Sequence, residues 1–179
     1  KLIREALKRA KAVDLEAEMR EEPITGAPLS LRTPEGWIFS DKGISWIDPK
    51  THTPANVCRT PILLTQRLKS LETGDEKMEI AFKRDGEWQR AIYPRSVIFS
   101  SRSITALADL GCTITSENSK NVVKFLGALE SENIDIIPKN DATSTFGWQP
   151  GRRFIPGHDE GITLDIDPSQ RGMAAAYCQ

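Results

Sequence analysis

The sequence has few cysteines, no long hydrophobic run and no signal-peptide core. Its three cysteines, Cys58, Cys112 and Cys178, are an odd number at wide intervals. A disulfide framework would show an even, patterned set, so these residues are typical of a protein from a reducing compartment. A membrane span needs about 18 or more consecutive apolar residues, and no stretch approaches that length. The sequence therefore predicts a cytoplasmic protein with no membrane partner.

An excess of charge of one sign is also missing. Lysine and arginine together number 24, and aspartate and glutamate number 25. A strongly basic domain would indicate nucleic-acid binding through phosphate neutralisation over its whole surface. Here any such patch must be local, with the acids elsewhere. Hydrophobic residues make up 39% of the chain and charged residues 27%, which is typical of a globular protein and excludes a disordered one.

The common catalytic and phosphate-binding motifs are absent from the sequence. There is no G-x-x-x-x-G-K-[ST] loop and no G-x-G-x-x-G turn to hold a phosphate. There is also no G-x-S-x-G nucleophile motif and no H-E-x-x-H zinc motif. Zinc needs four ligands at short spacing, and only Cys58 with His52 comes near this pattern. The sequence predicts no complete catalytic site and no cofactor held by this chain.

The hydrophobic periodicity divides the chain into three parts. Apolar residues at three- and four-residue steps predict a helix over residues 1–22, which docks either on its own domain or on another chain. Residues 23–36 are rich in proline and glycine and predict a linker. Residues 37–179 predict an α+β accessory domain. The chain begins with Lys1 and ends at Gln179 inside an apolar phrase, so we expect it to be a piece of a larger protein.

The pattern within residues 37–179 predicts an antiparallel β-meander sheet with helices packed on one side. One hairpin is expected over residues 36–47, and a second one turns at Asp85-Gly86, a strong two-residue turn signal. Residues 48–56 are expected to be a loop. Asn118 is expected to cap a helix, and Gly111 to end one. Further strands are predicted at residues 60–71, 77–83, 87–93, 112–115, 145–148 and 162–166, and helices at 100–110 and 118–129.

Basic and aromatic residues form the first candidate site. Alternation along residues 60–71 predicts Ile62, Leu64 and Leu68 on one face of a strand, and Arg67 with Lys69 on the other. Cations that follow a backbone and aromatic rings that stack on bases are what single-strand binding requires. The predicted nucleic-acid-binding residues are Arg67, Lys69, Lys83, Arg90, Arg95, Arg102, Trp148, Arg152 and Arg153. In the alternative interpretation, the aromatic residues Trp148 and Phe154 complete the core and the arginines pair with Glu79, Asp85 and Glu87.

Two carboxylates form the second candidate site. If residues 163–167 are a strand, Asp165 and Asp167 project to the same face. Such a pair can share a divalent cation, as metal-dependent phosphoryl or nucleotidyl transfer requires. Asp159, Glu160 or Asp135 would supply a third ligand. The alternative is a solvated strand end, because a proline follows directly.

The first hairpin offers a third candidate. Trp37 and Trp46 alternate with polar residues on its two predicted strands. A ribbon or edge strand of this kind can dock a protein partner by adding strands to a sheet. This pattern is consistent with an interaction or scaffold module that has no affinity for nucleic acid.

Several phrases of the sequence, taken in order, resemble the N-terminal part of the domain-of-unknown-function family numbered 927. They are Thr60-Pro-Ile-Leu-Leu64, Met78-Glu-Ile-Ala-Phe82, Tyr93-Pro-Arg95, Ile104-Thr-Ala-Leu-Ala-Asp-Leu-Gly111, Phe146-Gly-Trp148 and Gln170-Arg-Gly172. The resemblance covers residues 37–179. It implies a non-catalytic domain of a helicase-like protein from bacteriophages and mobile elements.

The resemblance also implies a set of partners. These are DNA, in single-stranded form, other replication proteins, and further copies of the parent protein. In such proteins an ATPase region with a phosphate-binding loop follows this domain. ATP and Mg²⁺ are therefore expected only for that region, and no residue of this chain is assigned to them.

Overall fold

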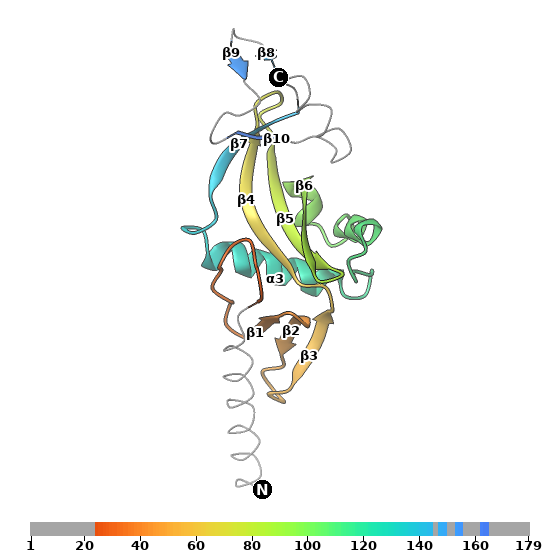
Figure 1. Cartoon of the computed structure of the whole chain (residues 1–179). Coiled ribbons are helices and arrows are strands. Elements are labelled where there is room, and N and C mark those ends of the chain that lie inside the picture. The colour runs from red at the N-terminus through yellow and green to blue at the C-terminus, as the bar shows by residue number, and fades with distance from the viewer. Residues whose placement is uncertain (1–23, 145–146, 150–152, 156–161, 165–179) are drawn as a thin grey trace, which may run out of the picture.

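The computed structural model describes residues 24–144 together with the short strands 147–149, 153–155 and 162–164. The predicted helix over residues 1–22 lies outside the described residues. The predicted α+β class is confirmed, with sheets and a small number of helices (Figure 1). The described elements are β1 (Trp37–Ser40), β2 (Gly43–Ile47), β3 (Pro54–Cys58), β4 (Ile62–Ser70), β5 (Glu76–Arg84), β6 (Glu87–Pro94), α2 (Arg95–Ile98), the 3₁₀ helix η1 (Ile104–Leu110), α3 (Ser119–Glu132), β7 (Lys139–Thr143), β8 (Gly147–Gln149), β9 (Arg153–Ile155) and β10 (Ile162–Leu164).

The main sheet is mixed rather than wholly antiparallel. Its strand order is β10-β7-β4-β5-β6. The consecutive strands β4, β5 and β6 form the predicted antiparallel meander. However, β7 runs parallel to β4, and β10 runs parallel to β7. A parallel return needs a crossover connection, and the segment from α2 to α3 supplies it.

The turn of the second hairpin has the backbone that the sequence predicted. Asp85 and Gly86 both have positive φ, 52° and 85°. This is the condition for a two-residue turn whose twist matches the strands on either side. The turn fixes the register of β5 and β6, in which Arg84 pairs with Glu87.

A second, three-stranded antiparallel sheet has the order β1-β2-β3. The predicted first hairpin is confirmed, with Trp37 opposite Trp46. The predicted loop over residues 48–56 is partly wrong, because β3 begins at Pro54. A proline is tolerated there since β3 is an edge strand. Gly43 has φ of 108°, and a Cβ at this position would lie 2.0 Å from the carbonyl oxygen of Cys58, so only glycine fits.

The helical part differs from the prediction in two places. In place of the predicted helix over residues 100–110 there is the shorter 3₁₀ helix η1, which Gly111 ends with a φ of 86°, as expected. The sequence did not predict α2, which lies before that range. The predicted strand over residues 112–115 is wrong. Thr113 lies in a loop, where its backbone N–H donates to the Thr60 hydroxyl at 2.9 Å. Residues 112–115 are therefore held by hydrogen bonds to the loop at Thr60 and not by pairing with another strand.

Asn118 stands at the N-cap of α3, as predicted, but its side chain does not cap the helix. Its Oδ1 accepts a hydrogen bond from the Thr115 backbone N–H at 2.8 Å. Its Nδ2 donates to the carbonyl oxygens of Val57 and Thr113, both at 2.9 Å. The side chain therefore ties the start of α3 to the end of β3.

Both faces of the main sheet are covered. The apolar stripe of α3, Val122, Phe125, Leu126 and Leu129, is fully buried and forms one cluster with the strands. Phe125 contacts the rings of Trp37 and Phe39 at centroid distances of 5.3 and 5.4 Å. On the opposite face, Leu63 and Ala81 are also buried. The predicted linker packs against the core cluster through Ile24, Ala27, Leu29 and Leu31, and in Figure 1 it lies beside α3 and the lower end of β4. No helix in the described part of the chain is long and apolar enough to cross a membrane.

The linker is fixed to the body at both of its ends. The Trp88 indole N–H donates to the carbonyl oxygen of Thr25 at 3.1 Å. At the other end, the Asn133 carboxamide accepts from the backbone N–H of Arg32 at 2.7 Å and donates to its carbonyl at 2.8 Å. Residues 24–36 are therefore part of the folded domain.

Candidate anion-binding site

A β-bulge in β4 decides which side chains face α3. Leu64 pairs with Ile80 on β5, whereas Gln66 pairs with Glu79, so Thr65 is an extra residue. An extra residue reverses the alternation of the residues that follow it. The Thr65 hydroxyl donates to the buried Glu79 carboxylate at 2.6 Å, which provides this residue with a hydrogen-bond partner.

The bulge overturns the predicted faces of β4. Ile62 and Leu64 face α3, but Leu68 faces the opposite side. Arg67 pairs with Met78 and therefore shares the face of Leu64. The sequence pattern assumed an uninterrupted strand, and it therefore placed Arg67 away from the apolar residues.

A cavity of about 220 Å³ lies on this face, beyond the bulge. It is formed by residues from β4, β5, β7, α2 and α3 and from the segment after α3. The lining residues are Arg67, Leu68, Glu76, Lys77, Met78, Arg95, Glu130, Ile134 and Lys139. Alternation along β5 directs the Lys77 side chain to the opposite face, since Lys77 pairs with Leu68. The cavity therefore has an apolar floor at Met78 and a charged rim.

Arg95 is held firmly by acids on this rim. Its two terminal nitrogens donate to the two oxygens of Glu130 at 2.6 and 2.7 Å. Its Nε lies 3.8 Å from Glu76, and its guanidinium lies 4.5 Å from the Phe99 ring centroid. The hydrogen bonds that Arg95 donates to Glu130 raise the pKa of Arg95. The positive charge of Arg95 is therefore largely neutralised.

Arg67 has no such neutralisation. Its Nη2 donates to the carbonyl oxygens of Ile134 and Ile137 at 2.9 and 3.0 Å. Its Nε is buried without a hydrogen-bond partner. Among the described residues, no carboxylate lies within ion-pair distance of this guanidinium. Within the described part of the chain, Arg67 is therefore a positioned cation whose charge is balanced only by carbonyl dipoles.

Lys139 stands beside Arg67 on the neighbouring strand. The two residues are register partners of the parallel β4–β7 pair, so their side chains share one face. Neighbouring strands lie about 4.8 Å apart, and like charges at facing positions repel. Lys139 is exposed and makes no hydrogen bond or ion pair within the described part of the chain. The two residues form an uncompensated pair of cations.

Sequence reasoning did not select Lys139 or Glu130. Lys139 follows Pro138 at the start of β7, in a segment with no alternating pattern. Lys139 lies beside Arg67 because β7 pairs in parallel with β4, and no local sequence pattern predicts this pairing. Glu130 lies four residues after Leu126, and its position on the inner side of α3 was the available signal.

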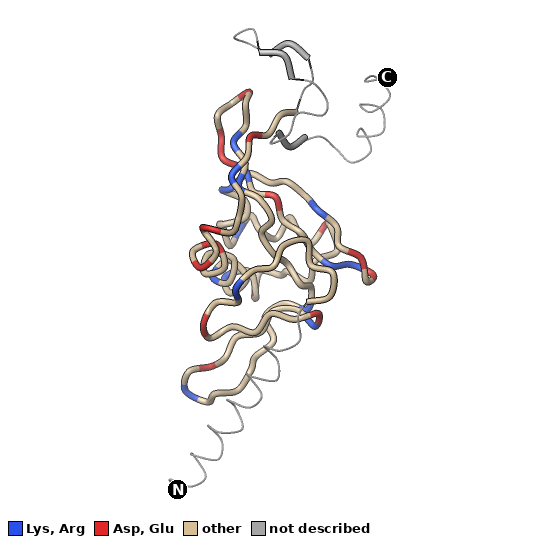
Figure 2. The backbone as a smooth tube through the Cα atoms, turned by 60° about the vertical axis from the view of Figure 1, so that its left-hand side comes forward, with Lys and Arg blue, Asp and Glu red and all other residues tan. Residues whose placement is uncertain are grey.

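The predicted basic residues do not form one continuous surface. Lys69 is exposed on the face of Arg67, in register with Glu76 and Asp141. Lys83 and Arg90 project to the opposite face. Lys83 donates to Asp41 at 2.8 Å, a bond that lowers the pKa of that carboxyl group. Figure 2 shows lysine and arginine positions on the strands close to the acidic loop between β4 and β5.

One ion pair that the alternative interpretation expected is present. Arg90 Nη1 lies 3.5 Å from Glu79, as the alternative interpretation expected. Asp85 pairs with its neighbour Arg84 at 3.5 Å. Arg102 is exposed in the turn between α2 and η1.

The C-terminal candidates are only partly described. Trp148 lies in β8 and pairs in register with Phe154 of β9, the strand that also contains Arg153. The sequence had predicted a strand that ends at Trp148, and β8 includes this residue. Arg152, Asp165 and Asp167 lie outside the described residues. The predicted two-carboxylate metal site therefore stays a prediction.

The described residues show no other cluster suited to a metal. No group of three His, Cys, Asp or Glu residues among them is placed to hold an ion. Cys58 and Cys112 are buried thiols. Burial raises the pKa of Cys112 to about 12, and the nearby Cys58 contributes to this shift. Neither thiol is therefore a reactive thiolate at neutral pH.

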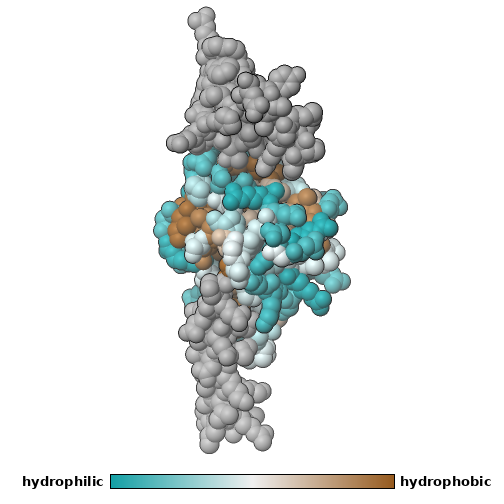
Figure 3. Space-filling model, viewed as in Figure 1, coloured by the Kyte–Doolittle hydropathy of each residue, from teal (hydrophilic) through white to brown (hydrophobic). Residues whose placement is uncertain are grey.

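Only one of the two tryptophans in the first hairpin, the third candidate site, is exposed to a partner. Trp37 is buried against Phe125, so it is not available to a partner. Trp46 is 38% exposed. Ile134, at the rim of the cavity, is 51% exposed, and Figure 3 shows a hydrophobic patch on the side where the segment after α3 emerges in Figure 1.

The fold and the cavity define an α+β domain that presents two uncompensated cations on one sheet face. A family model described as a domain of unknown function, DUF927, matches residues 34–166. The match begins just before β1 and ends just after β10. The chain belongs to the DUF927 family. No curated protein matches it.

Proposed function

We propose that this chain is a non-catalytic domain that engages single-stranded DNA in a replication helicase or primase-helicase of a bacteriophage or mobile element. The family membership supports the context, because helicase-like proteins of this kind are what the sequence resemblance implies. The pair of cations on β4 and β7 supports the contact with nucleic acid. ATP and Mg²⁺ belong to the ATPase region of the parent protein.

The observation that carries the proposal is the presence of Arg67, Lys69 and Lys139 on one face of adjoining strands. Cations arranged along a surface attract phosphates and release the counterions that the strand had bound. Glu76 and Asp141 lie in register beside Lys69 and limit the net charge. The affinity is therefore expected to be modest and strongly dependent on salt.

Fluorescence anisotropy with a labelled single-stranded oligonucleotide tests this proposal. For single strands, the logarithm of affinity falls with the logarithm of salt concentration by about 0.7 for each phosphate neutralised. Three cations predict a slope of about −2. Lys69→Ala and Lys139→Ala should each weaken binding and reduce the slope by about 0.7.

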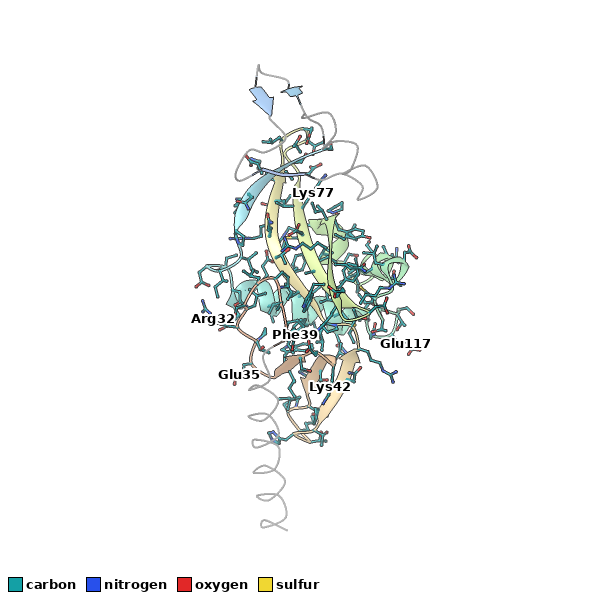
Figure 4. All side chains as sticks on the ribbon, viewed as in Figure 1. Arg32, Glu35, Phe39, Lys42, Lys77 and Glu117 are labelled. Atoms are coloured by element: carbon teal, nitrogen blue, oxygen red, sulfur yellow. The ribbon has the colours of Figure 1, made fainter. Side chains whose placement is uncertain are left out.

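A matched control is Lys42→Ala, which removes an exposed charge from the turn between β1 and β2. Lys77 belongs to β5 and lines the cavity. In Figure 4, Lys42 lies far from Lys77, in the lower part of the view. This variant should bind like the wild type. An absence of binding at low salt, or an equal loss in all three variants, would contradict a nucleic-acid contact at this face.

The same proposal includes assembly of the parent protein and contacts with other replication proteins. Sedimentation velocity over a range of protein concentrations tests self-association, and removal of residues 1–22 tests the part played by the predicted first helix. In the natural reading frame, a G-x-x-x-x-G-K-[ST] loop downstream of this domain is the expected sign of the ATPase region. A protein that is monomeric and inert towards DNA at low salt would argue against both roles.

A further inference from the structure

We propose that the cavity beside β4 and β7 binds a single doubly charged phosphate group, between Arg67 and Lys139. The inference rests on the proposed function only for the source of the phosphate, which is either a free ion or the terminal phosphate of a nucleic-acid strand. The shared chemistry is that of a phosphate dianion. Nothing in the fold requires an enzyme reaction at this position.

The size of the cavity limits its ligand. At about 220 Å³ it is smaller than the roughly 300–1,000 Å³ of pockets that enclose cofactors and drug-sized ligands. It is large enough for one tetrahedral anion with water. A whole nucleoside triphosphate does not fit, which agrees with the lack of a phosphate-binding loop in the sequence.

The charges on the rim select the anion. Glu130 and Glu76 lie on α3 and β5 and are engaged by Arg95, at 2.6 and 3.8 Å. Arg67 on β4 and Lys139 on the neighbouring strand β7 have no carboxylate within ion-pair distance among the described residues. Two neighbouring uncompensated cations match a dianion. A carboxylate or a phosphodiester of the strand backbone carries a single negative charge and leaves one cation unbalanced.

The hydrogen-bond donors are also in place. Arg67 uses Nη2 for the carbonyl oxygens of Ile134 and Ile137, and these two bonds fix the plane of its guanidinium. Nη1 makes no hydrogen bond with the described residues and is not buried, so it is available to a ligand. Charge-assisted bonds from Arg and Lys to phosphate oxygens are among the strong ones in proteins. A preset guanidinium loses little conformational freedom when the anion binds.

The test uses the 179-residue chain and three probes: inorganic phosphate, an oligonucleotide with a 5′-phosphate, and the same oligonucleotide with a 5′-hydroxyl. Titration calorimetry or NMR should show saturable binding of inorganic phosphate. Lys139→Ala should weaken it about tenfold, the effect of one lost charge-assisted hydrogen bond. Arg67→Lys, which keeps the charge but loses the fork, should also weaken it. Lys42→Ala should leave it unchanged.

A pH series adds a readout that general charge attraction does not give. The 5′-phosphate of the oligonucleotide is a phosphate monoester with a second pKa of about 6, so its advantage over the 5′-hydroxyl strand should grow as the pH rises from 5 to 7. Sulfate is a dianion throughout this range and should show no such rise. Equal pH profiles for the 5′-phosphorylated strand and sulfate would overturn the preference for a dianion that forms above pH 6.

The outcomes separate this inference from the proposed function. Tighter binding of the 5′-phosphorylated strand, lost in Lys139→Ala, identifies a strand terminus as the source. Binding of inorganic phosphate with no affinity for either oligonucleotide supports the cavity and refutes the nucleic-acid proposal. Equal binding of both oligonucleotides with no effect of inorganic phosphate overturns the cavity site and leaves the proposed function standing. Phosphate binding that survives Lys139→Ala and Arg67→Lys also overturns it.

Discussion

The sheet face beneath α3 is filled in two different ways on the two sides of the Thr65 bulge. On one side, Ile62 and Leu64 are fully buried in the same cluster as Phe125. On the other side, Arg67 and Lys139 stand beside a cavity. The same helix covers both halves. One extra residue in a strand can therefore place charged side chains on a face that is otherwise apolar without changing the fold, because it reverses the alternation of every residue that follows.

The two halves should respond differently to substitution. The apolar half provides cohesion through close packing, and the charged half provides positioned groups for a ligand. Residues of the first kind should therefore affect the free energy of unfolding strongly. Residues of the second kind should affect it less and binding more.

The largest effect is expected for Phe125→Ala. This ring is fully buried and contacts both Trp37 and Phe39, so its removal leaves a cavity that its neighbours cannot close. The expected loss is about 3–5 kcal/mol in the free energy of unfolding. That is a large fraction of the total stability of a typical domain, about 5–15 kcal/mol. Urea denaturation followed by tryptophan fluorescence measures it.

Lys124→Ala is the matched control, because Lys124 is the exposed neighbour of Phe125 on the same helix. Its expected effect is within about 0.5 kcal/mol. Similar losses in the two variants would show that α3 does not pack on this face, and the comparison between the halves would then have no basis.

The sequence predicted the apolar half well and the charged half poorly. Strong local signals, such as Asp85-Gly86 and the spacing of Val122, Phe125 and Leu129, determine turns and buried stripes. The bulge at Thr65 has no comparable signal, because threonine suits an ordinary strand equally well. The faces of Arg67 and Leu68 were therefore assigned the wrong way round.

Pairing between strands that are distant in the sequence explains why Lys139 was not predicted as a site residue. Lys139 reaches Arg67 only because β7 returns parallel to β4, and the local sequence does not indicate a parallel partner. The alternating pattern of β5 and the Trp88 strand was sufficient for the meander, since those strands are consecutive. The part of the candidate site that the sequence identified, Arg67, Lys69 and Arg95, lies on or directly after this meander.

An intermediate effect is expected for Arg95→Ala, in the charged half. The substitution leaves the Glu130 carboxylate, whose side chain is 10% exposed, without the two hydrogen bonds it accepts. Leaving a largely buried charged acceptor unpaired costs about 1–3 kcal/mol. The cost stays below that of a fully buried pair because Arg95 itself is 37% exposed and water screens it.

The double variant Arg95→Met with Glu130→Leu tests whether the cost comes from the unpaired carboxylate. It removes both charges together, so no unpaired carboxylate remains. We expect it to be more stable than Arg95→Ala alone, and a double-mutant cycle in urea gives the coupling energy. A double variant as unstable as the sum of the two single ones would mean that the pair does not interact.

The smallest effect is expected at Glu72, where the loop after β4 meets the end of β7. Its carboxylate accepts hydrogen bonds from the Thr143 hydroxyl at 2.5 Å and the Ser144 backbone N–H at 2.8 Å. Partial burial raises the pKa of this group, but hydrogen bonds from Thr143, Ser144 and Ser70 outweigh it and lower the pKa from 4.5 to about 2. The ionised form is therefore favoured in the folded state.

A folded-state pKa below the ordinary value gives stability that is fully present above pH 4.5 and is lost as the pH falls towards about 2. Glu72→Gln keeps an accepting oxygen but removes the charge, so it should be less stable than the wild type at pH 6 and nearly equal to it at pH 2.5. Because Glu72 is an exposed residue, solvent screening keeps the difference small. Glu117→Gln, an exposed acid with no hydrogen bond to the described residues, is the control in the same urea series. If the two glutamine variants lose stability in parallel across this pH range, Glu72 does not hold the end of β7, and the strand that positions Lys139 must be fixed by its ladders with β4 and β10.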